Sequence, residues 1–165
     1  MASEIVHRTG AEDAEFAEKE LTDSILAAAI EVHRWLGPGL LESIYQVSLQ
    51  HELSLRGVPF RSQVVVPLNY KGRALAGSLR IDLLVDDVVI VEIKAVNALD
   101  DIHRAQLLSY LRLLGRQTGL LINFNVPLLK HGIKRVVNSS YPSASSASSA
   151  PSAPSAPSAP SAPLR

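Results

Sequence analysis

The spacing of apolar residues changes at Pro59, and this change limits the folds that the chain can adopt. Before it, apolar residues recur every three or four positions over 21–36 and 40–55, which predicts two amphipathic helices separated by Gly37-Pro38-Gly39. After it, short runs rich in valine and isoleucine predict strands, because β-branched side chains suit a pleated sheet. We expect these strands at 63–68, 78–85, 88–96, 119–124 and 133–137. A further helix over 99–115 separates the third strand from the fourth.

The resulting order, α-α-β-β-β-α-β-β, predicts an α/β fold with a mixed central β-sheet flanked by helices.

From residue 139 onward almost only Ser, Ala and Pro occur, and such a segment has too little apolar surface to form a core. We therefore expect a disordered tail over 139–165. Residues 1–20 are polar and acidic, and we expect a flexible N-terminal lead there. Residues 21–138 remain, which is the size of one ordinary domain.

Charge and cysteine content restrict the functions that the chain can have. Its formal net charge is zero, whereas proteins that bind nucleic acid chiefly through phosphates usually carry a basic excess. A nucleic-acid role must therefore rest on a local basic patch or on metal ions. Cysteine is absent, so disulfides and thiolate metal sites are excluded. With no apolar run near the roughly 20 residues of a membrane helix and no signal-peptide pattern, we expect a cytoplasmic protein without a membrane partner.

The strands expected on either side of Asp86-Asp87 carry charged residues, and three of these are Asp82, Glu92 and Lys94. Glu92 and Lys94 are two residues apart, so they project from the same face of a strand. Asp82 lies on the preceding strand, and the tight turn between the strands brings it opposite the neighbourhood of Glu92. Two carboxylates and an ammonium should therefore meet inside an otherwise apolar sheet.

Charged groups in such surroundings cost several kcal/mol unless they are paired, hydrogen-bonded or bound to metal. Two carboxylates suit Mg²⁺ or Mn²⁺, which prefer oxygen ligands. The lysine can position or deprotonate a water molecule, or stabilise charge on a phosphate. The alternative is a buried salt bridge between Lys94 and Asp82 or Glu92, with no catalytic role.

Four polar residues on the helices could complete this site. Glu42 and Tyr45 share one helix face, and Gln106 and Tyr110 share another. Each also has an ordinary interpretation: an acid in the first turn of a helix, or a half-buried tyrosine. We expect Trp35 to be a core anchor at the end of its helix.

These motifs together resemble a known family. Gly39, Glu42 and Tyr45 have the spacing of the GxxExxY proteins, a prokaryotic family placed in the PD-(D/E)XK nuclease superfamily. The resemblance continues through the D…ExK and QxxxY elements, and it covers residues 21–138. It implies a restriction-endonuclease-like core for this part of the chain.

The resemblance also implies roles for individual residues. Asp82 and Glu92 match the metal-binding acids of the superfamily, Lys94 matches its catalytic lysine, and Glu42 matches the helix-borne acid that often joins the metal. Gln106 and Tyr110 resemble the element that supports the site or contacts nucleic acid.

We therefore expect a Mg²⁺- or Mn²⁺-dependent nuclease that hydrolyses phosphodiester bonds in DNA. The alternative is a catalytically silent nucleic-acid-binding or adaptor domain in a DNA repair or defence complex. In a third interpretation, the chain is a nuclease module whose DNA affinity comes from a partner subunit, and a homodimer is also open.

Overall fold

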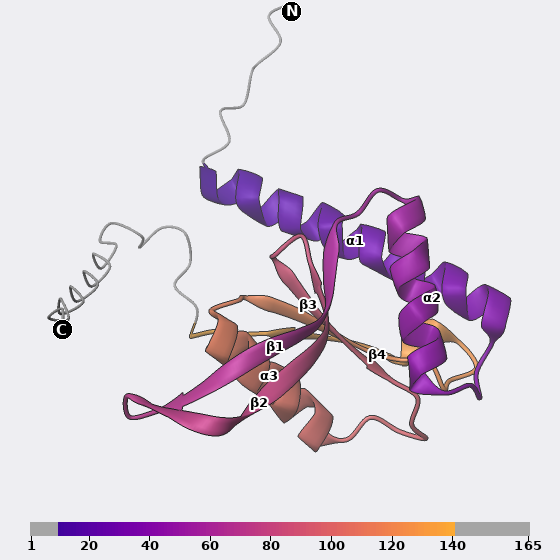
Figure 1. Ribbon diagram of the computed structural model, residues 1–165. Coiled ribbons are helices and arrows are strands. Elements are labelled where there is room, and N and C mark those ends of the chain that lie inside the picture. Colours follow the sequence, from indigo (N-terminus) through magenta and orange to yellow (C-terminus); the bar gives the residue numbers. More distant parts are fainter. Residues whose placement is uncertain (1–9, 141–165) are drawn as a thin grey trace, which may run out of the picture.

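The computed structural model describes residues 10–140, so the expectations for residues 1–9 and 141–165 lie outside this part of the chain. Its elements follow one another as Figure 1 shows. Their bounds are α1 Gly10–Leu36, α2 Glu42–Leu55, β1 Phe60–Tyr70, β2 Arg73–Val85, β3 Val89–Lys94, α3 Asp101–Leu114, β4 Thr118–Asn123, the 3-10 turn η1 Leu129–His131 and β5 Ile133–Val137. The predicted α/β class and the α-α-β-β-β-α-β-β order are confirmed. Among the described helices, none is long and apolar enough to cross a membrane.

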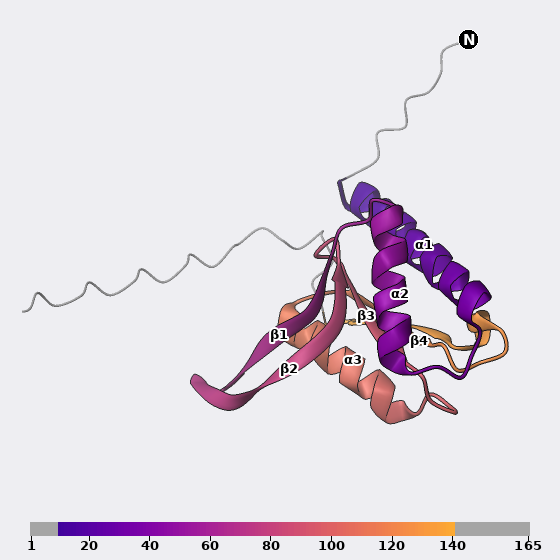
Figure 2. The ribbon, with the colours of Figure 1, turned by 45° about the vertical axis from the view of Figure 1, so that its right-hand side comes forward.

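The strands form one mixed sheet in the order β1-β2-β3-β4-β5. Neighbouring strands are antiparallel except β3 and β4, which run parallel because α3 carries the chain back between them. Helices α1 and α2 cover one face of the sheet, and α3 covers the other (Figures 1 and 2). Each face therefore has its own apolar core, one around Tyr45 and Phe124 and the other around Ile90 and Leu107.

Strand β3 is shared by both cores. Its residues from Val89 to Ile93 are buried, which explains why its apolar residues form a nearly continuous run instead of alternating with polar ones. Helix α3 lies very close to the next strand, because a Cβ atom at Gly119 would come within 2.8 Å of the Leu107 side chain. The absence of a side chain at Gly119 thus lets α3 approach the sheet beside the charged residues of β3.

Helix α1 begins at Gly10, so the expectation of a flexible lead is wrong for residues 10–20. This part of the helix is held by polar tertiary contacts. Glu18 accepts hydrogen bonds of 2.6 Å from Thr118 and 2.9 Å from Arg135. Hydrophobic periodicity did not reveal this docking, because it detects apolar faces and not hydrogen bonds to distant strands.

The expectation that Trp35 is a core anchor is also wrong. Its side chain is 82% exposed, and the indole N–H donates to Glu31 on the same helix. The last turns of α1 instead direct Val32 and His33 inward, and His33 forms a hydrogen bond with the carbonyl of Val126. Helical spacing defines which residues share a face, but the neighbouring elements decide which face is covered.

Candidate active site

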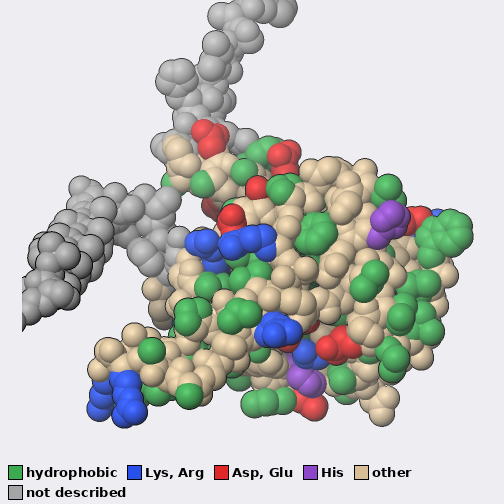
Figure 3. All heavy atoms as spheres, viewed as in Figure 1, with side chains coloured by type: hydrophobic (Ala, Val, Ile, Leu, Met, Phe, Trp, Pro, Cys, Tyr) green, Lys and Arg blue, Asp and Glu red, His purple; other side chains and the backbone are tan. Residues whose placement is uncertain are grey.

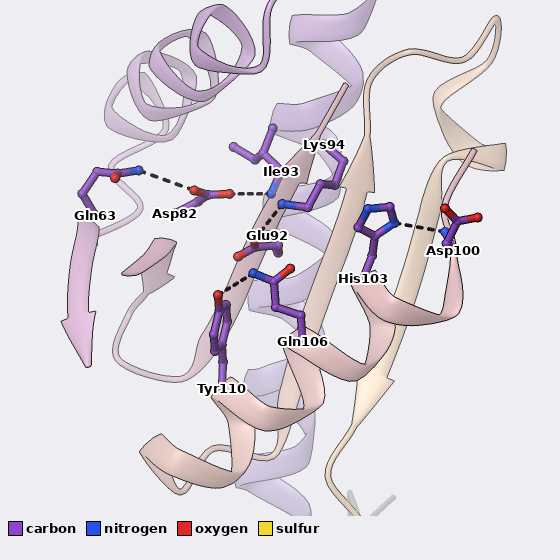
Figure 4. A network of polar contacts seen from close by, with 9 residues as sticks. All are labelled: Gln63, Asp82, Glu92, Ile93, Lys94, Asp100, His103, Gln106 and Tyr110. Atoms are coloured by element: carbon purple, nitrogen blue, oxygen red, sulfur yellow. Dashed lines mark hydrogen bonds and ion pairs between the residues drawn. The ribbon is translucent and has the colours of Figure 1, made fainter. Parts of the chain in front are cut away.

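The predicted charged residues lie where β2 and β3 separate. Pairing between the two strands ends at Leu83 and Val91. Asp82 is the next residue of β2 beyond this pairing. Its side chain replaces the backbone as the partner of β3, because Oδ2 accepts a hydrogen bond of 2.9 Å from the Ile93 N–H (Figure 4). The register therefore puts Asp82 opposite Glu92, as the tight turn between the strands predicted.

Among residues 10–140, Glu92 is the one acidic residue that is fully buried, with 3% exposure. Its Oε1 accepts a hydrogen bond of 2.8 Å from the Lys94 ammonium (Figure 4). The other oxygen, Oε2, is buried and has no hydrogen-bond partner within the described residues. A buried carboxylate oxygen without a partner is costly, so Oε2 is an oxygen at which an additional donor or a cation would be stabilising.

The surroundings of Glu92 favour its neutral form. Burial is the largest cause and the charge of Asp82 the second, and with Glu42 they raise the pKa of Glu92 from 4.5 to about 7. The hydrogen bond and the charge of Lys94 oppose this change without cancelling it. Glu92 therefore holds its proton more tightly than a carboxyl exposed to water.

Lys94 has the opposite balance. Its burial lowers the pKa, but the hydrogen bond and charge of Glu92, with the charges of Glu42 and Asp82, outweigh burial and raise the pKa above 10.5. Lys94 is consequently a stable cation at any physiological pH. Among the open roles, this favours a positive hydrogen-bond donor over a group that takes up a proton.

Glu42 is half-buried at the first position of α2. It is near enough for its charge to raise the pKa of both Glu92 and Lys94. It comes from a helix on one face of the sheet, whereas Asp82 and Glu92 come from adjacent strands, and tertiary packing alone brings the three acids to the same region.

Tyr45 fixes the turn from which Glu42 emerges. Its hydroxyl donates to the Gly37 carbonyl at 2.7 Å and accepts from the Leu40 N–H at 3.0 Å. The ring is fully buried and stacks on Phe124 at a centroid distance of 4.6 Å. Tyr45 is thus a buried packing residue whose hydroxyl holds the turn that precedes Glu42.

Gln106 and Tyr110 approach Glu92 from α3 (Figure 4). They share a helix face, as their spacing predicted, and the Gln106 amide donates to the Tyr110 hydroxyl. Tyr110 is 4% exposed and belongs to the core beneath α3, while Gln106 is half-buried at its edge. Gln106 is thus the member of the pair that a substrate can reach.

Gln63 was not predicted to be part of the site. Its amide donates to Asp82 Oδ1 in a long hydrogen bond of 3.4 Å (Figure 4). Gln63 has a φ of 51°, a left-handed conformation within β1. No local sequence signal marks a glutamine for this position, and only the pairing of β1 with β2 places it opposite Asp82.

The chemistry of Asp82 and Glu92 fits a small divalent cation, since both present carboxylate oxygens and Glu92 Oε2 lacks a partner. Within residues 10–140, however, no three His, Cys, Asp or Glu side chains lie close enough together to hold a metal. The resemblance implied Glu42 as a third metal-binding acid, and in the structure it comes from the first turn of α2, whereas Asp82 and Glu92 come from adjacent strands. Glu92 and Lys94 are in direct contact, and Asp82 and Glu42 lie within electrostatic reach of both.

Comparison with known proteins supports this interpretation of the fold. No curated protein and no solved structure matched the chain. A family model described as the PD-(D/E)XK nuclease superfamily matches residues 19–136, which include every site residue described above. The matched segment makes up most of the chain and contains the whole sheet except the last residue of β5. The chain therefore belongs to the PD-(D/E)XK nuclease superfamily.

Proposed function

We propose that the protein is a metal-dependent nuclease that hydrolyses phosphodiester bonds in DNA, with Asp82, Glu92 and Lys94 as its catalytic residues. One observation carries the proposal: Glu92 is buried beside Asp82, with one oxygen bound to Lys94 and the other without a partner. Structural ion pairs usually satisfy their buried oxygens, whereas a ligand-binding acid keeps one available. Membership of the superfamily supports the phosphodiester as the bond that is cleaved.

Asp82 and Glu92 would hold Mg²⁺ or Mn²⁺, and Glu42 would add a third negative charge beside them. When bound, the cation supplies a Lewis acid and an activated water for attack on the phosphate. Lys94 remains protonated and donates to a phosphate oxygen, which stabilises the negative charge that builds up there. Gln106 offers an amide at the edge of the site for contact with the substrate or the water.

We also propose that the chain is a member of the GxxExxY family within this superfamily. The contacts of Tyr45 support this assignment, because they give the spacing of Gly39, Glu42 and Tyr45 a physical reason. Tyr45 holds the turn before α2 through its hydrogen bonds, and this turn fixes the position of Glu42 at the start of the helix.

Cleavage of labelled double-stranded DNA, single-stranded DNA and RNA tests the proposal, with Mg²⁺, Mn²⁺ or a chelator present. Wild-type protein should cleave DNA only with a divalent cation. Lys94→Ala should lower the rate by about 10²- to 10³-fold, the usual effect of removing one group that stabilises developing charge. Lys19→Ala, at an exposed ion pair on α1, is the matched control and should cleave normally. A well-folded wild type that cleaves none of these substrates with either metal would refute the proposal.

A catalytically silent nucleic-acid-binding or adaptor domain is the second candidate. The Lys94–Glu92 ion pair favours it, because this contact of 2.8 Å neutralises much of the site without a metal. Such a domain would bind DNA equally well with and without Mg²⁺ and would cleave nothing.

A further inference from the structure

The β1–β2 hairpin holds a stretch of sequence with basic residues and no acidic ones. Residues 60–81 contain four Lys and Arg residues and no Asp or Glu: Arg61, Lys71, Arg73 and Arg80. The formal charge of this segment is therefore +4, and because the whole chain sums to zero, the remaining residues carry −4. The local basic patch that a neutral nucleic-acid-binding protein requires is thus present in the hairpin formed by β1, β2 and the turn between them.

Most of this hairpin projects from the body of the protein. Strand β2 pairs with β3 only from Leu83 to Val85, so residues 73–80 have no neighbouring strand other than β1. Figures 1 and 2 show this part as a two-stranded ribbon that extends beyond the sheet. Lys71, Arg73 and Arg80 are all exposed on it.

The cations of the ribbon are not balanced by acids. At its base Arg61 is paired with Asp87, but within residues 10–140 Lys71, Arg73 and Arg80 take part in none of the ion pairs. Figure 3 shows Lys and Arg side chains at the tip and no acidic side chain on the ribbon in that view. Unpaired cations on a projecting element attract a polyanion, because binding releases the counterions of its phosphates.

The shape of the ribbon indicates which polyanion it fits. The major groove of duplex DNA is about 12 Å wide and admits a two-stranded β-ribbon. At about 3.3 Å per residue, Arg73 and Arg80 are separated by about 23 Å along the strand, the length of about seven base-pair steps. Arg80 is two residues before Asp82 on the same strand, so the basic ribbon leads directly to the proposed catalytic acids.

We infer that the β1–β2 ribbon binds in the major groove of duplex DNA, with Lys71, Arg73 and Arg80 in contact with the phosphates that border the groove. Duplex DNA is then the substrate class, in which the ribbon positions the backbone against Asp82 and Glu92. This inference rests on the proposed function for the chemistry at the acids, but the binding step can be measured without it.

The test is fluorescence anisotropy in a chelator, which prevents cleavage, with a duplex of about 20 base pairs, longer than the span of the ribbon. The variant is Lys71→Asn, Arg73→Gln and Arg80→Gln. Asparagine is chosen at Lys71 because this residue has a φ of 49°, which asparagine tolerates well. The matched control, Lys19→Gln, Arg34→Gln and Arg56→Gln, removes the same charge from ion pairs on α1 and at the end of α2.

The slope of log K against log salt concentration should become shallower by about 0.9 for each lost phosphate contact, thus by up to about 2.7 in the ribbon variant. The control should keep the wild-type slope. If the ribbon variant does not fold, Arg73→Gln with Arg80→Gln should still make the slope shallower by about 1.8. A folded ribbon variant with the wild-type slope overturns the inference.

Two further measurements test the duplex groove as the binding partner. Single-stranded DNA of the same sequence should bind more weakly than the duplex, and this preference should disappear in the ribbon variant. Equal binding of single-stranded and duplex DNA overturns the inference. It is also overturned if polyglutamate displaces the labelled duplex as efficiently as unlabelled duplex does at the same concentration of negative charge. Ribbon-dependent binding without cleavage would refute the nuclease proposal alone, whereas cleavage with a ribbon-independent affinity would refute the ribbon inference alone.

Discussion

Glu92→Gln replaces a buried acid with a neutral side chain of the same shape, and its effect on stability depends on pH. Because burial and Asp82 raise the pKa of Glu92 to about 7 in the folded protein, the folded state binds this proton more tightly than the unfolded chain, where the pKa is 4.5. The wild type therefore has its full stability below pH 4.5 and loses part of it as the pH rises through 7. The glutamine variant has no such proton to lose.

The size of the effect follows from the difference of the two pKa values. A shift of one pKa unit corresponds to about 1.4 kcal/mol. A carboxyl whose pKa is shifted from 4.5 to about 7 therefore lowers the free energy of unfolding at high pH by about 3 kcal/mol relative to low pH. At low pH, both the protonated Glu92 carboxyl and the glutamine amide that replaces it leave Lys94 without a charged partner at this position, so the two proteins should be similarly stable. With the pH raised to about 8, Glu92→Gln should become more stable than the wild type by about 2 to 3 kcal/mol.

Urea denaturation in a chelator, repeated from about pH 5 to about pH 8.5, measures this difference directly. Asp23→Asn, which removes an acid from an exposed helix pair with Lys19, is the control and should show little pH-dependent difference from the wild type. If the ion pair with Lys94 governed Glu92, its folded pKa would lie below 4.5, and the variant would be less stable than the wild type by a nearly constant amount over this pH range. That result would refute the view of Glu92 as a destabilised, ligand-ready acid and would make it a structural ion pair.

Further expectations concern the metal, the turn before α2 and the tail. Mn²⁺ should raise the melting temperature of the wild type, and Asp82→Asn should abolish this rise because the cation loses one of its two carboxylates; scanning calorimetry that finds the wild type unaffected would contradict a metal site. Tyr45→Phe should lower the free energy of unfolding in urea by about 1 to 3 kcal/mol, because the Gly37 carbonyl and the Leu40 N–H lose their shared partner; an unchanged midpoint would show that the hydroxyl is dispensable. Removing residues 139–165 should leave the melting temperature nearly unchanged, since the sequence offers little apolar surface there; a large decrease would show that it packs on the domain.

Much of the fold could be predicted from the sequence because it depends on local patterns. Apolar spacing located every described α-helix and strand in the correct order, although the ends of several elements differ, most of all the start of α1 at Gly10. The same local geometry put Glu92 and Lys94 on one face of a strand, because side chains alternate with a period of two. The tight turn at Asp86-Asp87 then set the register that brings Asp82 opposite Glu92, since a short hairpin loop permits few pairings.

The surroundings that give these charges their properties depend on contacts between distant segments. Burial of Glu92 and the approach of Glu42 from α2 arise only when helices pack on both faces of the sheet. The hydrogen bond from Gln63 arises only when β1 pairs with β2. The ribbon is a similar case. Its charge can be counted in the sequence, but its projection beyond the sheet depends on the tertiary structure, in which β3 pairs with β2 no further than Leu83. The sequence alone thus determined which residues share a strand or a helix face, through periods set by backbone geometry. Tertiary structure decided which charges are buried, which lie together and which remain free to meet a polyanion, because solvent exclusion and electrostatic fields depend on distances in space and not along the chain.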